Sequence, residues 1–124
     1  MVLEQSLRNT GSKPIVTDMY DHNFFVIDGL TPEPDFAKPI DEGQRALTPL
    51  TGFGSTAKDY DIRVTNCKTG AAVRVTADVP LTRLVFWTVH TVLSPEAYMH
   101  LNVAPGQESK WRIQYEFSAG ARTN

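Results

Sequence analysis

The chain has 124 residues, of which 41% are hydrophobic and 21% charged, and this composition predicts one globular domain with a modest core. Its 12 basic and 14 acidic residues are interspersed and give a formal net charge of -2. Nucleic acid and membranes are therefore not expected partners, because phosphate and anionic lipid surfaces attract a basic face.

The chain is also expected to be cytoplasmic and free of cofactors. Apolar runs such as residues 84–87 are too short to span a bilayer, and the first residues lack the pattern of a secretory signal. The single cysteine, Cys67, excludes an internal disulfide and is expected to be a surface thiol in a turn. No metal is expected, because His22, His90 and His100 lack the spacing of metal ligands.

From the N-terminus, residues 3–8 resemble a strand and residues 9–14 a turn. Residues 20–27 follow as an extended segment, in which alternate side chains share a face. One face carries Tyr20, His22, Phe24 and Val26, and the other carries Asp21, Asn23, Phe25 and Ile27. Residues 29–43 contain three prolines and two glycines, which predicts a long loop.

The rest of the chain is also patterned as strands. Residues 59–65 and 71–77 flank a short connector and predict a hairpin. Residues 82–93 are partly apolar on both faces, as in a central strand that ends before Pro95. Residues 109–117 alternate, with Trp111, Ile113, Tyr115 and Phe117 facing inward, and they follow a turn at Pro105-Gly106. The fold class is therefore all-β, a single antiparallel β-sandwich domain over residues 1–124 with a frayed tail at 118–124.

Two residues stand out as candidates for chemistry. His22 lies on an otherwise apolar face, so it is either bonded to a core partner or used in chemistry. Glu96 follows Pro95, where the strand is expected to end, and its carboxylate is either solvated or a general base. Together they suit acid–base work on a sugar, with His22 as the acid and Glu96 as the base. Trp87, Tyr98 and Trp111 either stack on a sugar face or pack within the fold.

These residues belong to stretches that resemble a known family. Residues 17–25, Thr-Asp-Met-Tyr-Asp-His-Asn-Phe-Phe, resemble the segment around the catalytic histidine of aldose 1-epimerases, the galactose mutarotase-like proteins. Residues 7–15 resemble the strand and turn that precede this segment in the family, and residues 61–75 resemble a later hairpin. Glu96 with residues 103–108 and 115–117 resembles the family's C-terminal segment, so the pieces occur in the family's order.

The resemblance implies specific roles. His22 would protonate the ring oxygen of an aldose, and Glu96 would remove the proton of the anomeric hydroxyl, so that ring opening and closure interconvert the anomers. Beside these roles, Asp21, Asn23, Trp87 and Tyr98 are expected to contact the sugar, the two aromatic residues by stacking. The string Asp-His-Asn-Phe also resembles a later family segment whose aspartate binds sugar hydroxyls, and under that alignment Asp21 replaces His22 as the functional residue.

The chain also departs from the family, whose members are much longer and have an N-terminal half that supplies another sugar-contacting histidine. We therefore expect the chain to resemble only the C-terminal part of the family's large β-sandwich. The alternatives are a non-catalytic sugar-binding sandwich and a truncated fragment that acts as an interaction module. A half-sandwich exposes apolar sheet surface, so a homodimer through an exposed face or edge is a further expectation.

Overall fold

The computed structural model describes residues 1–27, 46–50, 52–89 and 92–120. The described residues form one short 3₁₀ helix, η1 (Ala57–Asp59), and eight strands: β1 (Val2–Arg8), β2 (Ile15–Met19), β3 (Ala46–Leu50), β4 (Asp61–Thr65), β5 (Ala72–Ala77), β6 (Arg83–Val89), β7 (Val92–Val103) and β8 (Glu108–Ser118). Within this part of the chain, no helix is long and apolar enough to cross a membrane.

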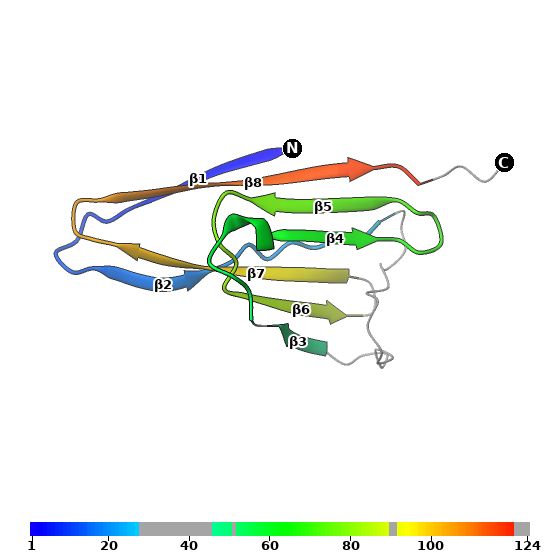
Figure 1. The fold of residues 1–124 in the computed structure, drawn as a ribbon, viewed down its shortest axis with the longest axis horizontal. Helices are drawn as coiled ribbons and strands as arrows, with labels where there is room; N and C mark the ends of the chain where they lie inside the picture. The colour runs from blue at the N-terminus through cyan, green and yellow to red at the C-terminus, as the bar shows by residue number, and fades with distance from the viewer. Residues whose placement is uncertain (28–45, 51, 90–91, 121–124) are drawn as a thin grey trace.

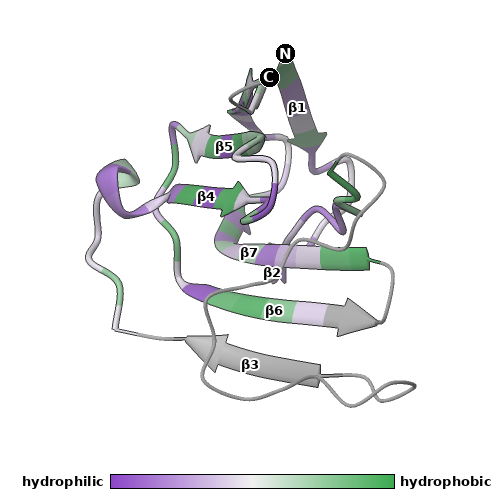
Figure 2. Cartoon of the chain, turned by 90° about the vertical axis from the view of Figure 1, so that its right-hand side faces the viewer, coloured by the Kyte–Doolittle hydropathy of each residue, from purple (hydrophilic) through white to green (hydrophobic). Residues whose placement is uncertain are grey.

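The strands form two antiparallel sheets that pack as two layers (Figures 1 and 2). The first sheet has the order β1-β8-β5-β4, and the second has the order β2-β7-β6-β3. Every strand pair in both sheets is antiparallel. The predicted fold class, an all-β antiparallel sandwich, is confirmed.

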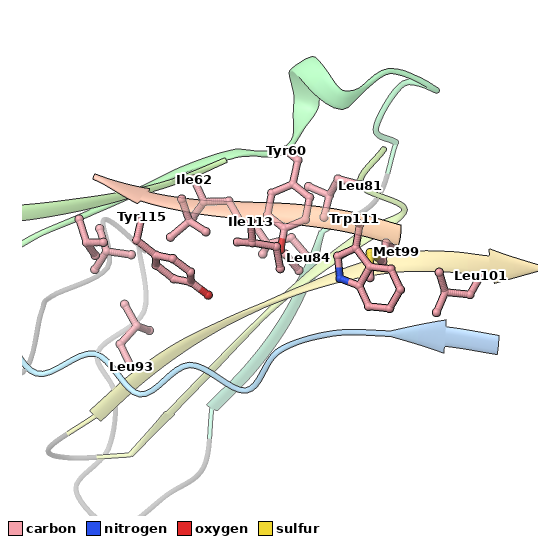
Figure 3. Close-up of a cluster of buried hydrophobic side chains, with 14 of the residues drawn as sticks. Tyr60, Ile62, Leu81, Leu84, Leu93, Met99, Leu101, Trp111, Ile113 and Tyr115 are labelled. Carbon is pink, nitrogen blue, oxygen red and sulfur yellow. The ribbon is translucent and has the colours of Figure 1, made fainter. Parts of the chain in front are cut away.

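The core lies between the two sheets (Figure 3). Strand β8 supplies Trp111, Ile113 and Tyr115 to it, as their alternation predicts. Strand β7 supplies inward-facing residues from the other side, including Leu93 and Met99. The prediction that Phe117 faces inward was wrong, because this residue lies near the end of β8 and is 67% exposed.

A buried asparagine ties together the two turns that connect the sheets. The Asn9 side-chain amide donates to the carbonyls of Lys13 and Val103, each at 2.8 Å, and its Oδ1 accepts from the Gly11 amide at 2.9 Å. The Asn9 carbonyl also accepts from the amide of Gly106. Gly106 has a φ of 76°, which favours glycine, so the predicted Pro105-Gly106 turn is confirmed.

The predicted hairpin between β4 and β5 is present, and its turn is also organised by an asparagine. Asn66 Oδ1 accepts from the backbone amides of Lys68 and Thr69, and Gly70 takes a φ of 75°. The Asn66 side-chain amide reaches out of the turn to the carbonyl of Ile27 at 2.8 Å. This bond fixes the end of the 20–27 segment to the first sheet.

One prediction about strand boundaries was wrong. Residues 82–93 do not form one strand, since β6 ends at Val89 and β7 begins at Val92. Glu96 consequently lies within β7 rather than at the end of a strand. Residues 28–45 and 121–124 lie outside the described residues, and with them the predicted 29–43 loop and most of the predicted tail. His90 also lies outside the described part.

Pro95 sits inside β7 because its missing amide faces away from β6. In an antiparallel strand, alternate residues bond to opposite neighbours. Leu93, two residues earlier, exchanges both of its backbone bonds with Phe25 at 2.8 and 3.2 Å. Pro95 therefore faces the same side, toward residues 20–24, and the β6–β7 ladder loses no bond.

Candidate functional site

The outer faces of the two sheets differ in chemistry. The first sheet carries surface ion pairs, among them Arg74–Asp61 at 2.6 Å and Arg112–Glu4 at 2.8 Å. The outer face of the second sheet instead carries aromatic rings grouped around one carboxylate. A face of this kind suits a small organic ligand better than a face of paired charges.

Strand register brings the residues of this face together. Paired residues of antiparallel strands share a face, and β6 and β7 pair Arg83 with Tyr98, Val85 with Glu96 and Trp87 with Ser94. Glu96 lies in the middle of this row and is only 5% exposed. A carboxylate so deeply placed needs a partner, because burial of an unpaired charge is unfavourable.

That partner comes from residues 20–24, here named the His22 segment. The segment continues β2 past the Met19–Met99 pair as far as the bridge between Phe25 and Leu93. Counting inward from these two pairs places His22 opposite Glu96. Exposure along the segment alternates as the sequence predicts, with Tyr20, His22 and Phe24 on the outer side.

His22 and Glu96 are in direct contact. The Nε2 atom of His22 lies 3.2 Å from Oε1 of Glu96, and the two side chains are 39% and 7% exposed. The other carboxylate oxygen, Oε2, accepts a long hydrogen bond of 3.4 Å from the Tyr98 hydroxyl. The two residues predicted from the sequence as an acid and a base therefore lie in contact, and Tyr98 contacts the same carboxylate.

Aromatic rings surround the imidazole of His22. Its ring centroid lies 4.6 Å from that of Phe24, 5.2 Å from that of Trp87 and 6.0 Å from that of Tyr20. Phe24 and Trp87 also contact each other edge-on at 5.8 Å. Phe24 is 60% exposed, so much of its side chain is accessible.

Tyr98 is held between two neighbours. Its ring lies 4.3 Å from that of Tyr20, and the guanidinium carbon of Arg83 lies 3.9 Å from its centroid. Desolvation by burial raises the pKa of Tyr98 above its ordinary value, and the Tyr20 hydrogen bond and the Glu96 charge raise it further. The phenol therefore stays protonated at neutral pH and donates to Glu96.

Sequence reasoning missed Tyr20, Phe24 and Arg83 as members of this face. The alternation of residues 20–27 does place Tyr20 and Phe24 beside His22, so a signal for these two was present. Arg83 depends on its pairing with Tyr98 across β6 and β7, which no local pattern reveals.

Asp21 and Asn23 lie on the opposite side of the His22 segment. The amide nitrogen of Gln5 donates to the Asp21 carboxylate at 3.1 and 3.3 Å, and the Tyr115 hydroxyl donates to Asn23 Oδ1 at 2.9 Å. Trp111 is a core residue, 6% exposed, and its indole donates to Gln5 Oε1 at 2.6 Å.

The remaining candidates are simpler. His100 pairs with Asp18 at 2.9 Å, and both side chains are about half exposed. Cys67 is an exposed free thiol. Across the described ranges, no three His, Cys, Asp or Glu residues are grouped as metal ligands would be.

The contact between His22 and Glu96 has a chemical consequence. An acid and a base that act on one sugar ring must each reach a different oxygen, so both must face the ligand. In this structure His22 Nε2 and Glu96 Oε1 instead contact each other at 3.2 Å. Acid–base chemistry at this pair would require a ligand oxygen to replace this contact.

The comparisons with known proteins bear on the fold. No protein-family model matches the chain, and no curated protein matches it. Among solved structures, the chain is similar to the Slr1438 protein from Synechocystis sp. PCC 6803, with a TM-score of 0.71 and 13% sequence identity. The match covers 95% of this chain and 50% of that protein, so the chain spans about half of its length. At this identity, the likeness establishes a shared fold.

Proposed function

We propose that the chain binds an aldose on the outer face of the second sheet and interconverts its anomers by acid–base ring opening. The observation that carries the proposal is the contact of 3.2 Å between His22 Nε2 and Glu96 Oε1, set among aromatic rings. A histidine and a carboxylate supply an acid and a base that work near neutral pH.

The proposed reaction separates this pair. Protonated His22 donates its proton to the ring oxygen while Glu96 accepts the proton of the anomeric hydroxyl. The bond between the anomeric carbon and the ring oxygen breaks, which gives an open-chain aldehyde. Rotation about the adjacent carbon–carbon bond and the reverse proton transfers close the ring as the other anomer, and both residues return to their starting states.

The neighbouring residues support these roles. Trp87 and Phe24 offer ring surface to the C–H face of a sugar, and the Tyr98 hydroxyl lies beside Glu96. The engagement of the Asp21 carboxylate by Gln5 favours His22 over Asp21 as the functional residue of this segment. We also propose a cytoplasmic location, with which the free thiol of Cys67 is compatible.

A specific observation favours a second candidate, a sugar-binding sandwich without catalysis. His22 and Glu96 satisfy each other directly, and such a pair can serve only to neutralise a buried carboxylate. The aromatic rings would then stack on a sugar that never meets the two groups in reactive geometry.

Anomer exchange measured by NMR on a panel of aldoses separates the two candidates. We expect the wild-type chain to accelerate exchange, and His22→Gln and Glu96→Gln each to reduce the rate about a hundredfold or more. His100→Gln is the matched control, because it alters the other histidine–carboxylate pair on the same sheet. Sugar-dependent amide shifts without acceleration would support the binding candidate, and equal rates in all variants would overturn catalysis.

A further inference from the structure

The residues on either side of His22 are anchored to the other sheet. Asp21 accepts two hydrogen bonds from Gln5 of β1, and Asn23 accepts one from Tyr115 of β8. Both donors belong to the first sheet, whereas Glu96 belongs to the second. The His22 segment is thus the place where side chains of the two sheets meet around one candidate catalytic residue.

The anchors matter because the His22 segment lacks a regular ladder. The β2–β7 ladder ends at Met19, and the next pairing along the segment is the bridge between Phe25 and Leu93. Between these points Pro95 has no amide hydrogen to offer. Side-chain hydrogen bonds therefore hold this segment, whereas backbone ladders hold the strands on either side.

Anchoring of the neighbours also sets the direction of His22. Adjacent side chains of an extended segment point to opposite sides. When Asp21 and Asn23 are held on the inner side, the imidazole between them is directed outward, toward Glu96 and Trp87. A rotation of the segment that turned His22 away would break all three anchoring bonds.

The bonds through Gln5 have a defined direction. The Trp111 indole can only donate, so it fixes the oxygen of the Gln5 amide at 2.6 Å. The amide nitrogen of Gln5 then faces Asp21, whose carboxylate can only accept. A flipped Gln5 amide would place its NH₂ group against the indole N–H and its oxygen against the Asp21 carboxylate, so a single orientation is stable.

We propose that Gln5 and Tyr115 are positioning residues that act through Asp21 and Asn23 to keep His22 on the outer face of the second sheet, opposite Glu96. The catalytic consequence rests on the proposed function, but the positioning itself does not. Tyr115 keeps its proton at neutral pH, because burial raises the pKa of its phenol above the ordinary value.

The first test follows the His22 ring in the folded protein by NMR, without any sugar. The variants are Gln5→Glu, which places a second carboxylate before Asp21, and Tyr115→Phe, which removes only the hydroxyl. We expect both to weaken the nuclear Overhauser contact between the His22 and Trp87 rings and to shift the His22 ring protons. The His100 ring protons should stay in place as an internal reference.

Two matched controls separate positioning from general damage. Gln114→Glu places a second carboxylate beside Glu116 on the exposed face of the first sheet, and Val103→Ala truncates a core side chain at the far end of β7. Both should leave the contact between His22 and Trp87 unchanged. If Gln5→Glu does not fold, Gln5→Ala replaces it, because that variant removes the donor without adding charge.

A double-mutant cycle tests the path through Asn23. Asn23→Ala and Tyr115→Phe remove the two ends of one bond, so the double variant should show the same loss of contact as either single variant. Asn23→Ala combined with Val103→Ala should show only the loss of Asn23→Ala. An undiminished contact between His22 and Trp87 in folded Tyr115→Phe and in the folded Gln5 variant would overturn the inference.

Measurements of kcat and KM test the positioning role separately from the proposed catalysis. If the wild type catalyses anomer exchange, Tyr115→Phe should lower kcat about tenfold or more with a smaller change in KM. Unchanged kcat would overturn positioning while leaving catalysis intact. A wild type without activity would overturn the proposed function, and the NMR measurements would still decide the positioning.

Discussion

The hydroxyl of Tyr98 lies 3.4 Å from Oε2 of Glu96, while His22 contacts Oε1 of the same carboxylate. The two oxygens of one buried group therefore have different partners from different parts of the chain. Under the proposed function, a sugar oxygen replaces the contact of His22 with Oε1, while the Tyr98 hydroxyl keeps its contact with Oε2.

Loss of the Tyr98 hydroxyl should weaken the site without unfolding the protein. The bond to Glu96 is long, so we assign it about 1 kcal/mol, which corresponds to about a fivefold change in a rate or an affinity. Tyr98→Phe should slow anomer exchange by about that factor. His100→Gln is again the control and should leave the rate unchanged, because it alters a histidine–carboxylate pair away from Glu96. Exchange by Tyr98→Phe at the wild-type rate would remove Tyr98 from the mechanism.

The bonds of Asn9 predict a large loss of stability from one small substitution. Asn9→Ala leaves the Val103 carbonyl and the Gly11 amide without their side-chain partner in a buried turn. We expect the free energy of unfolding to fall by about 2 kcal/mol in urea titrations. Asn102→Ala, at an exposed position, should change it by less than about 0.5 kcal/mol. Equal effects at the two positions would contradict this account.

Tyr60 predicts a loss of stability at alkaline pH. Burial raises the pKa of its phenol above the ordinary value of 10.0, and Tyr115 and Asp21 raise it further. Above about pH 10 the unfolded state releases this proton while the folded state keeps it. The stabilisation is therefore complete below pH 10 and is lost as the pH rises toward the folded pKa, by up to about 1.4 kcal/mol per pH unit.

Urea unfolding of the wild type and of Tyr60→Phe at pH 9 and pH 11 checks this expectation. The wild type should lose more stability between the two pH values than the variant does. Parallel losses would show that Tyr60 does not carry the effect. Tyr115→Phe provides a comparison, because burial raises the pKa of that phenol as well.

Much of the fold can be predicted from alternation in the sequence. The pattern of residues 109–117 identifies β8 and its buried side chains, apart from Phe117 at the strand end. The division of residues 82–93 into two strands escapes such reasoning, because neither glycine nor proline occurs between Val89 and Val92.

The site is predictable only where it depends on local pattern. Alternation places His22, Tyr20 and Phe24 on one side of their segment. The prediction that Glu96 lies at a strand end was wrong, because whether Pro95 ends the strand depends on which neighbouring strand its nitrogen faces. The anchoring of Asp21 by Gln5 joins a residue of the first sheet to a connecting segment, and no periodicity encodes such a contact.

Pro95 has a consequence for how this protein can change over evolution. Because the Pro95 nitrogen carries no hydrogen, the His22 segment has one backbone bond to β7 fewer, although the pairs Met19–Met99 and Phe25–Leu93 keep it in register. Substitutions at Tyr20 or Phe24 can then reshape the ligand-facing surface while the β6–β7 pairing stays intact. Relatives with this proline should share the sandwich and diverge in what they bind.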